Sequence, residues 1–392
     1  MTDDRSSADP DETTDAGRLP ADTTLLIVGP AGYKTERTGG IGRYIAEQRR
    51  HLDDRLSYDV IDTAIRTPSG PIGYLRALVT VLAGWLSCLL RRRPDIVHVH
   101  TSQDVSFLVS TPYVLLAGLV WNRPVVLHVH GSSFDEYVAD ASRPLAALQS
   151  AVFGASDAIV VLSEYWRDAL AVRAPAEKLV VLPNAIDPTE YVPDPSADPP
   201  HLVFVSNHIE RKGIVELTRA IDSLLTAGVE FRATIAGAGP LSEHAEALAS
   251  KHDEVEYIGF VPEERKRELL SEANVYVLPT YAEGLPIAVL EAMAGANAIV
   301  STDVGAIPSV VDDRNGAVVP PGDVDELTVE LDRLLSDPAM IERMGRVSRR
   351  RVEASYAWDG IIEDLLALYA GLVTDFPEES SRTGTAAATV DR

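Results

Sequence analysis

The sequence predicts two doubly wound α/β domains in tandem. Short apolar runs alternate with longer helical patterns, which is typical of βαβ units whose parallel sheet is covered on both faces. These runs form two series, at 24–29, 95–100, 125–130, 158–163 and 178–183, and then at 201–206, 231–237, 255–260, 275–280, 298–302 and 316–320. The stretch between the series, 193–200, holds four prolines in eight residues, so we expect a linker there.

The domain boundaries follow from these patterns. We expect a first domain over 23–192 and a second over 201–355, with their ligands at the carboxyl ends of both sheets. Residues 1–22 hold seven acidic residues and no apolar run, and 375–392 are rich in Ser, Thr and Ala. Both ends are therefore predicted to be disordered tails.

Composition restricts the class of protein. The 392 residues carry 59 Asp plus Glu against 35 Lys plus Arg, a net charge of −24, which argues against a sequence-independent nucleic-acid binder. Only five of the basic residues are Lys and 32 of the acidic ones are Asp, a bias that we interpret as adaptation to concentrated salt. The single cysteine, Cys88, rules out an intramolecular disulfide and fits a reducing, cytoplasmic location.

The apolar stretch 72–90 allows two interpretations. It is interrupted by Arg76 and followed by three arginines, 91–93, which resembles the flank of a membrane-binding segment. We favour a helix buried beside the strand that begins near Asp95, because Arg76 would be costly in lipid. A helix lying on the cytoplasmic membrane face is the alternative.

Two features of the first domain are candidates for chemistry. Gly39, Gly40 and Gly42 follow the first strand and precede a helix, so their amides could approach a phosphate; a flexible loop tip is the equal alternative, and the spacing does not support NAD. His98 and His100 share one strand, and His128 and His130 share another. Because no carboxylate or cysteine stands at ligand spacing, we predict core histidines and no metal site, except that His130 ends its strand at the cleft.

The second domain supplies the charged candidates. Arg211 and Lys212 follow its first strand, where two adjacent cations indicate an anionic ligand; a solvated helix cap is the alternative. Further on, Glu283 lies in a loop after a strand that ends at Pro279, and Glu291 lies one to two turns into the following apolar helix, where a carboxylate needs a partner.

The loop after Glu283 completes that pattern. The amides of Gly284 and Leu285 point to an anion, and carboxylates on either side could bind hydroxyls, which is the outline of a nucleotide sugar. By contrast, Asp323 of the Asp-x-Asp at 323–325 is predicted to be a helix N-cap, with Glu326 as its capping partner, and not a metal ligand.

From Tyr281 through GLPIAVLEAMA and VGAIPSVVDDRNGAVVPPGD, the chain resembles a retaining glycosyltransferase of family 4, which has the GT-B architecture of two Rossmann-like domains facing across a cleft. The resemblance covers about 24–372. It implies an acceptor domain, then a donor domain, and C-terminal helices at 356–374 that cross back to the first domain.

The resemblance also implies roles for the candidates. Glu283 would face the donor hexose and Glu291 the ribose, as the E-x7-E pair. Lys212 would neutralise the diphosphate, and Gly40 and its neighbours would close over the phosphates. His130 would contact the sugar, and the loop at Val261 would hold the base. One position departs from the family: Asn207 stands where an arginine is usual, with Arg211 as the substitute.

We therefore expect an enzyme that moves a sugar from a nucleotide diphosphate sugar to a hydroxyl acceptor, without a metal or other cofactor. The acceptor would be a glycan or a lipid-linked precursor, with possible peripheral contact at the inner membrane face. A non-catalytic binder of donor or glycan, motivated by Asn207, and a nucleotide-sugar epimerase are the alternatives.

Overall fold

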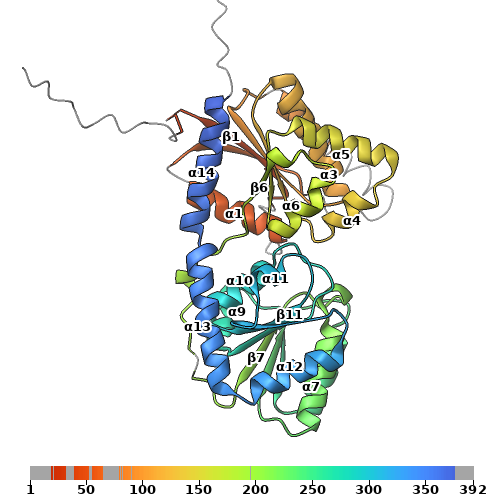
Figure 1. The fold of residues 1–392 in the computed structure, drawn as a ribbon, viewed down its shortest axis with the longest axis vertical. Coiled ribbons are helices and arrows are strands. Elements are labelled where there is room, and N and C mark those ends of the chain that lie inside the picture. Colours follow the sequence, from red (N-terminus) through yellow and green to blue (C-terminus); the bar gives the residue numbers. More distant parts are fainter. Residues whose placement is uncertain are drawn as a thin grey trace, which may run out of the picture.

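The computed structural model describes residues 19–375, apart from 21, 32–38, 53–54, 65–78, 80, 82, 90 and 195. It contains two Rossmann-like domains, one above the other in Figure 1, each built on a six-stranded parallel sheet. The predicted fold class is thus confirmed. The predicted tails, except residues 19, 20, 22 and 375, and the start of the predicted 72–90 helix lie outside the described residues.

The first sheet has the strand order β2-β1-β3-β4-β5-β6. Its strands are β1 (Thr24–Gly29), β2 (Ser57–Asp62), β3 (Ile96–Thr101), β4 (Val125–Val129), β5 (Ala158–Val161) and β6 (Leu179–Val181). The helices between them are α1 (Gly40–Leu52), α3 (Val105–Leu115) with its π-helical continuation η1 (Leu116–Trp121), α4 (Phe134–Ala139), α5 (Arg143–Ala155) and α6 (Glu164–Ala171). All five predicted strands are present, and β2 was missed. Because β2 is a half-exposed edge strand, it has no continuous apolar run.

The second sheet has the order β12-β11-β10-β7-β8-β9. Its strands, all predicted, are β7 (His201–Val205), β8 (Arg232–Ala236), β9 (Val255–Gly259), β10 (Val275–Leu278), β11 (Ala298–Thr302) and β12 (Gly316–Val319). Its helices are α7 (Ile214–Thr226), α8 (Ser242–Lys251), α9 (Glu263–Glu272), α10 (Ile287–Ala294), α11 (Ile307–Val310), α12 (Val324–Leu335) and α13 (Pro338–Ser355). The order in which strands are added to the sheet reverses between the parallel neighbours β7 and β10, so a ligand crevice is expected at the carboxyl ends of these two strands.

The last helix, α14 (Trp358–Asp375), lies along the first domain, directly after α13 along the second (Figure 1). Its buried side chains Trp358, Leu365 and Tyr369 join Leu25 and Ile27 of β1 in one apolar cluster. The end of the chain therefore covers one face of the first sheet.

The described part of the predicted helix at 72–90 is only partly buried. Its described residues, 79, 81 and 83–89, are helical, and Cys88 is buried, whereas Leu86 is 61% and Leu89 55% exposed. In the part of the chain that the structure describes, no helix is both long and apolar enough to span a membrane.

Candidate functional site

A cavity of about 390 Å³ lies between the two domains, at the carboxyl ends of their strands. Of the predicted site residues, those that line it are Gly40, His130, Arg211, Lys212, Glu283, Gly284 and Leu285. Other lining residues, which the sequence did not single out as binding groups, are Ile41, Ser102, Gln103, Gly131, Ser132, Asn184, Pro286, Ile287 and Ala288. The predicted residues Gly42, Val261 and Glu291 do not line this cavity.

Lys212 and Glu283 meet at the switch point of the second sheet. Lys212 follows β7 and Glu283 follows β10, and the lysine Nζ donates to Glu283 Oε1. Burial, with a smaller contribution from the positive charge of Arg211, lowers the pKa of Lys212, against the opposing effect of Glu283. The site thus holds a desolvated ammonium group against one carboxylate.

Gly213 brings this lysine close to β10. Its φ is 71°, and a Cβ there would lie 1.9 Å from the carbonyl oxygen of Pro279. Because only glycine fits this conformation at this distance, the turn that carries Lys212 can pack directly on the end of β10.

Arg211 and Thr280 fix the rest of the Glu283 loop. Arg211 Nη1 donates to the carbonyl oxygen of Ala282 at 2.6 Å and lies 3.5 Å from Glu283 Oε1. Thr280 Oγ1 donates to the same carboxylate oxygen at 3.1 Å. Asn207, Arg211 and Lys212 all line the cavity. Asn207 is uncharged, and Arg211 is the second positive charge beside Lys212.

Glu291 is 1% exposed and already has partners from both domains. Its Oε1 forms ion pairs with Arg43 of α1 and, at 3.0 Å, with Lys266 of α9. Arg43 Nη1 also lies 2.8 Å from Glu263. Although burial opposes it, the carboxylates of Glu291 and Glu263 raise the pKa of Arg43. The partner that a mid-helix carboxylate needs therefore includes an arginine of the opposite domain, which the sequence did not indicate.

Two side chains of the first domain hold the loop that follows Glu283. Trp166 Nε1 donates to the carbonyl oxygen of Gly284 at 3.1 Å, and Asn184 Nδ2 donates to that of Leu285 at 2.6 Å. Both residues are buried. Asn184 follows β6 at the carboxyl edge of its sheet, and that position was the signal that could have identified it.

His130 closes the cavity from the first domain. Its backbone N–H donates to the carbonyl oxygen of Thr101, and its Nε2 lies 3.0 Å from Nδ1 of His100. Burial lowers the pKa of His130 to about 3, so the ring is neutral at physiological pH. The structure thus brings His130 to the cleft, as predicted from its place at the end of a strand.

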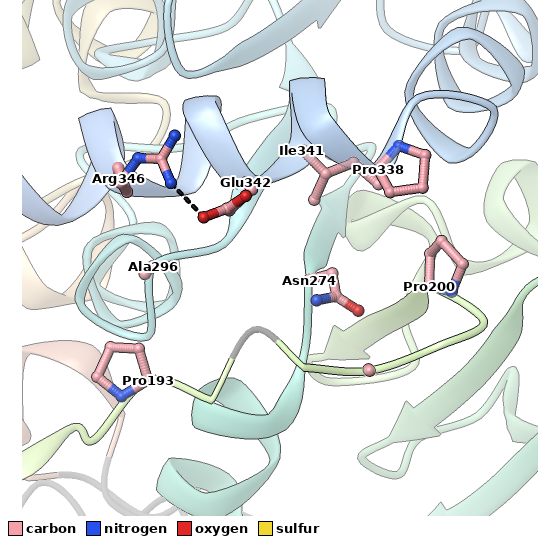
Figure 2. A pocket seen from close by; sticks show the side chains of 9 residues that line it. Pro193, Pro200, Asn274, Ala296, Pro338, Ile341, Glu342 and Arg346 are labelled. Carbon is pink, nitrogen blue, oxygen red and sulfur yellow. Dashed lines mark hydrogen bonds and ion pairs between the residues drawn. The ribbon is translucent and has the colours of Figure 1, made fainter.

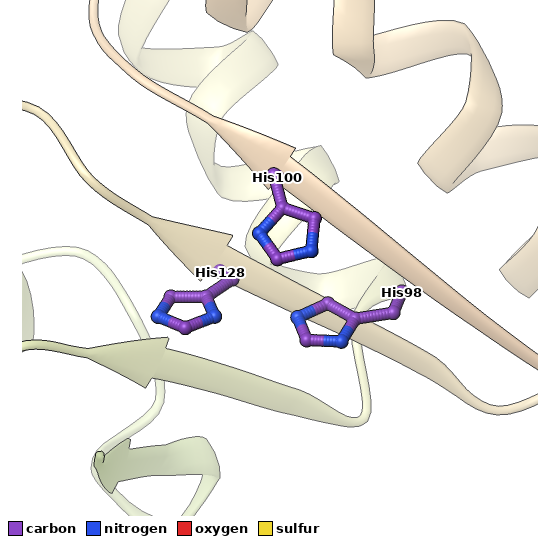
Figure 3. A group of neighbouring side chains, drawn as sticks. All are labelled: His98, His100 and His128. Atoms are coloured by element: carbon purple, nitrogen blue, oxygen red, sulfur yellow. The ribbon is translucent and has the colours of Figure 1, made fainter. Parts of the chain in front are cut away.

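The other three strand histidines form a buried stack behind it. His98, His100 and His128 (Figure 3) are fully buried, as predicted. One ring nitrogen of each lies within 4.8 Å of those of the other two. However, the angles between the ring planes are 9–29°. Because a nitrogen lone pair lies in the plane of its ring, the lone pairs of nearly parallel rings do not point to one centre. No carboxylate belongs to this group. The near-parallel rings favour the predicted core histidines over a shared coordination centre.

Asp323 is a helix cap, as predicted. Its carboxylate accepts the backbone N–H of Glu326 at 2.9 Å at the start of α12. The Asp-x-Asp is thus accounted for by capping.

A second cavity, of about 400 Å³, lies between the linker and α13. Figure 2 shows its lining of Pro193, Pro200, Pro338 and Ile341, with an ion pair between Glu342 and Arg346. Among the described residues that line it, the charged ones are Glu342 and Arg346, which pair with each other.

Two Rossmann-like domains with a charged cavity at their facing strand ends define a GT-B protein. The family model described as "Glycosyl transferases group 1" matches residues 199–337, and the "Glycosyl transferase 4-like domain" matches 46–185. The chain belongs to the family 4 glycosyltransferases of the GT-B fold, as the sequence motifs indicated.

Relatives and solved structures agree with this. The chain is 32% identical over 388 residues to alpha-maltose-1-phosphate synthase of Mycobacterium tuberculosis CDC 1551, covering 86% of this chain and 96% of that protein. The match to the amylovoran biosynthesis glycosyltransferase AmsK of Erwinia amylovora, 29% identical over 52% of this chain, spans only 54% of that protein, and the match to WcaL of Escherichia coli K12 spans 58%.

Among solved structures, sucrose-phosphate synthase from Thermosynechococcus elongatus has a TM-score of 0.75 at 19% identity and covers 90% of this chain and 99% of that one. Anabaena HepE, solved with UDP and glucose, has a TM-score of 0.67 at 15% identity and covers 89% and 100%. At these identities the likeness concerns the fold.

Proposed function

We propose that this protein is a retaining glycosyltransferase that moves a sugar from a nucleotide diphosphate sugar to a hydroxyl acceptor. The observation that carries the proposal is the contact of Lys212 with Glu283 at one wall of the interdomain cavity, with His130 on the opposite domain. A cation, a carboxylate and a neutral imidazole around one cavity suit a leaving diphosphate, a sugar hydroxyl and a transferred hexose.

The donor would lie with its diphosphate near Lys212, Arg211 and the amides of Gly284, Leu285 and Gly40, and with its hexose between Glu283 and His130. Glu291 would then bind the ribose, and the backbone near Val261 would bind the base. HepE was solved with UDP-glucose, and one relative of 28% identity is named a GDP-mannose-dependent mannosyltransferase. The comparisons thus support a nucleotide sugar as the donor class, with the base left to experiment.

The chemistry follows from the charges. Cleavage of the bond to the diphosphate develops positive charge at the anomeric carbon and negative charge on the leaving group, which Lys212 and Arg211 would stabilise without reorganisation. We therefore expect transfer to continue in excess EDTA. Glu283 accepts from Lys212 and Thr280, and these contacts weaken it as a nucleophile. That favours attack by the acceptor on the face that the diphosphate leaves, over a covalent glycosyl-enzyme.

The acceptor is proposed to be a lipid-linked or polysaccharide precursor. Exposed Leu86 and Leu89 precede exposed Arg91, Arg92 and Arg93 on the first domain, and a basic cluster beside exposed apolar side chains suits an anionic membrane surface. Flotation with phosphatidylglycerol vesicles tests this at matched salt. We expect wild-type protein to float, and a Leu86→Ser/Leu89→Ser variant to stay at the bottom. Failure of wild-type protein to float would contradict the membrane contact and leave the transfer reaction untouched.

Transfer itself is tested with purified protein and a panel of nucleotide sugars chosen by thermal shift in molar salt. Lys212→Met and Glu283→Gln should each lower kcat/KM by about 100-fold or more, the scale on which electrostatic stabilisers act. Lys251→Met, at an exposed lysine paired with Asp222, is the matched control and should keep full activity. Full activity in either site variant would overturn the proposal.

Two outcomes identify the alternatives. Conversion of the donor sugar without any acceptor would indicate an epimerase. Donor binding by calorimetry, with neither transfer nor slow donor hydrolysis, would indicate a non-catalytic binder.

A further inference from the structure

One ring nitrogen of His130 forms a hydrogen bond within the protein. Its Nε2 lies 3.0 Å from Nδ1 of His100, while the residue itself lines the interdomain cavity. Nδ1 of His130 is therefore the ring nitrogen left for a ligand in the cavity. Its hydrogen-bonding character, donor or acceptor, is set by the bond at Nε2.

His100 is locked in place by its surroundings. It is fully buried, stacks on His98 with ring centroids 4.2 Å apart, and lies against Tyr44 at 5.7 Å. His98 is in turn bound to Tyr369 of α14 at 2.5 Å and to Gln48 of α1 at 3.1 Å. The ring that contacts His130 is thus held by two helices and by the strand that carries it.

The missing hydrogen-bond partner of His100 Nε2 indicates where the ring protons of His100 and His130 lie. Burial lowers the pKa of both rings, so a single proton lies between two neutral imidazoles. Nε2 of His100 is buried with no hydrogen-bond partner among the described residues. Among backbone groups, a buried N–H without an acceptor is rarer than a buried carbonyl without a donor, and we apply the same preference to this ring. On that preference the proton of His100 would lie on Nδ1 and be donated to Nε2 of His130.

We propose that His100 is a positioning residue, which fixes His130 as the Nδ1–H tautomer and so presents an N–H donor to a substrate oxygen in the cavity. This rests on the proposed function, since that function places the transferred sugar against His130. It also assigns a direction to the contact: a hydroxyl or ring oxygen of the sugar accepts the hydrogen bond.

The test is the tautomer of His130, read from long-range proton–nitrogen correlations of uniformly ¹⁵N-labelled protein. The signal is assigned by its loss in His130→Gln. We expect the wild-type ring to be protonated on Nδ1 alone. His100→Leu should move the proton to Nε2 or give a mixture, whereas His100→Asn, whose amide N–H lies near the position of the lost Nδ1–H, should keep the wild-type pattern. His128→Leu is the matched control, because His128 belongs to the same stack but has no hydrogen bond to His130.

Kinetics of the same variants separate the inference from the proposed function. His100→Leu should lower kcat about tenfold, and His100→Asn should recover most of that loss. An Nε2–H ring in wild-type protein, or an unchanged tautomer in His100→Leu, overturns the inference whatever the activity. If His100→Leu does not fold, the wild-type and His100→Asn spectra decide. A changed tautomer with wild-type kinetics supports the positioning by His100 and instead overturns the role of His130 in transfer.

Discussion

The guanidinium of Arg43, in the first turn of α1, forms an ion pair with the carboxylate of Glu291, in α10 of the opposite domain. With Lys266 on the same oxygen, the carboxylate proposed to bind the ribose is enclosed by protein. We expect a ribose that binds this carboxylate to displace one of the two cations, and Arg43, which belongs to the opposite domain, would leave if the domains separate.

Replacing Arg43 with Gln should therefore tighten binding of the nucleoside diphosphate, because the ribose hydroxyls no longer compete with a buried ion pair. We expect Kd by calorimetry to fall about three- to tenfold, up to about 1.4 kcal/mol. Arg50→Gln is the control, since Arg50 lies on the same helix and pairs with Glu190 away from the cavity. Weaker binding in Arg43→Gln would show that Arg43 contributes to donor binding.

Gly213→Ala should both destabilise the protein and impair catalysis. A Cβ there would collide with Pro279, so the turn that carries Lys212 must move away from β10. Gly228→Ala is the control. Gly228 also has a positive φ but open space around its Cβ position, so this variant measures the conformational cost alone, about 1 kcal/mol. Urea unfolding should show a clearly larger loss for Gly213→Ala, together with a fall in kcat/KM. Equal losses in the two variants would contradict this packing argument.

The strands and the glutamate loop were predictable because continuous apolar runs and the residues that follow them are local signals. The edge strand β2 was not, since a half-exposed strand lacks such a run. The pairing of Arg43 with Glu291 was not predictable either, although Arg43 adjoins the predicted Gly42. It depends on how the two domains face each other, and no local pattern encodes that.

The lowered pKa of Lys212 predicts an alkaline limit to donor binding. Burial favours the neutral amine, so Lys212 loses its proton at a lower pH than a solvated lysine would, and the diphosphate loses its cation. Nucleotide affinity should thus fall on the alkaline side, below the ordinary lysine range. Lys212→Arg keeps its charge throughout and should abolish that fall. The same alkaline loss in Lys212→Arg would assign it to another group.

Salt should leave nucleotide affinity unchanged or raise it. With a net charge of −24, the protein repels a polyanionic donor at low ionic strength, but at about 1 M salt the Debye length is only about 3 Å. Binding then depends on contacts within the cavity, where Lys212 is shielded from solvent. Calorimetry from 0.1 M to 2 M KCl tests this. A steep loss of affinity would indicate that exposed charges hold the nucleotide.

The histidine stack predicts a loss of stability in mild acid. Burial lowers the pKa of His98, His100, His128 and His130, whereas in the unfolded chain each titrates near its ordinary value of about 6.5. Below that pH the unfolded state binds more protons than the folded state. The free energy of unfolding therefore has its full value above pH 6.5 and falls as the pH decreases. Each histidine contributes about 1.4 kcal/mol per pH unit once it is fully protonated in the unfolded chain.

His128→Leu tests this dependence, because both ring nitrogens of His128 are buried without a partner among the described residues. Removing an unsatisfied buried polar group should leave stability at pH 7.5 within about 1 kcal/mol of wild type, or raise it. Between pH 6.5 and 5.5 the variant should lose stability less steeply than wild type, by an amount approaching one histidine's contribution. The measurement is urea unfolding at each pH. Identical slopes for both proteins would mean that His128 does not stay neutral in the fold.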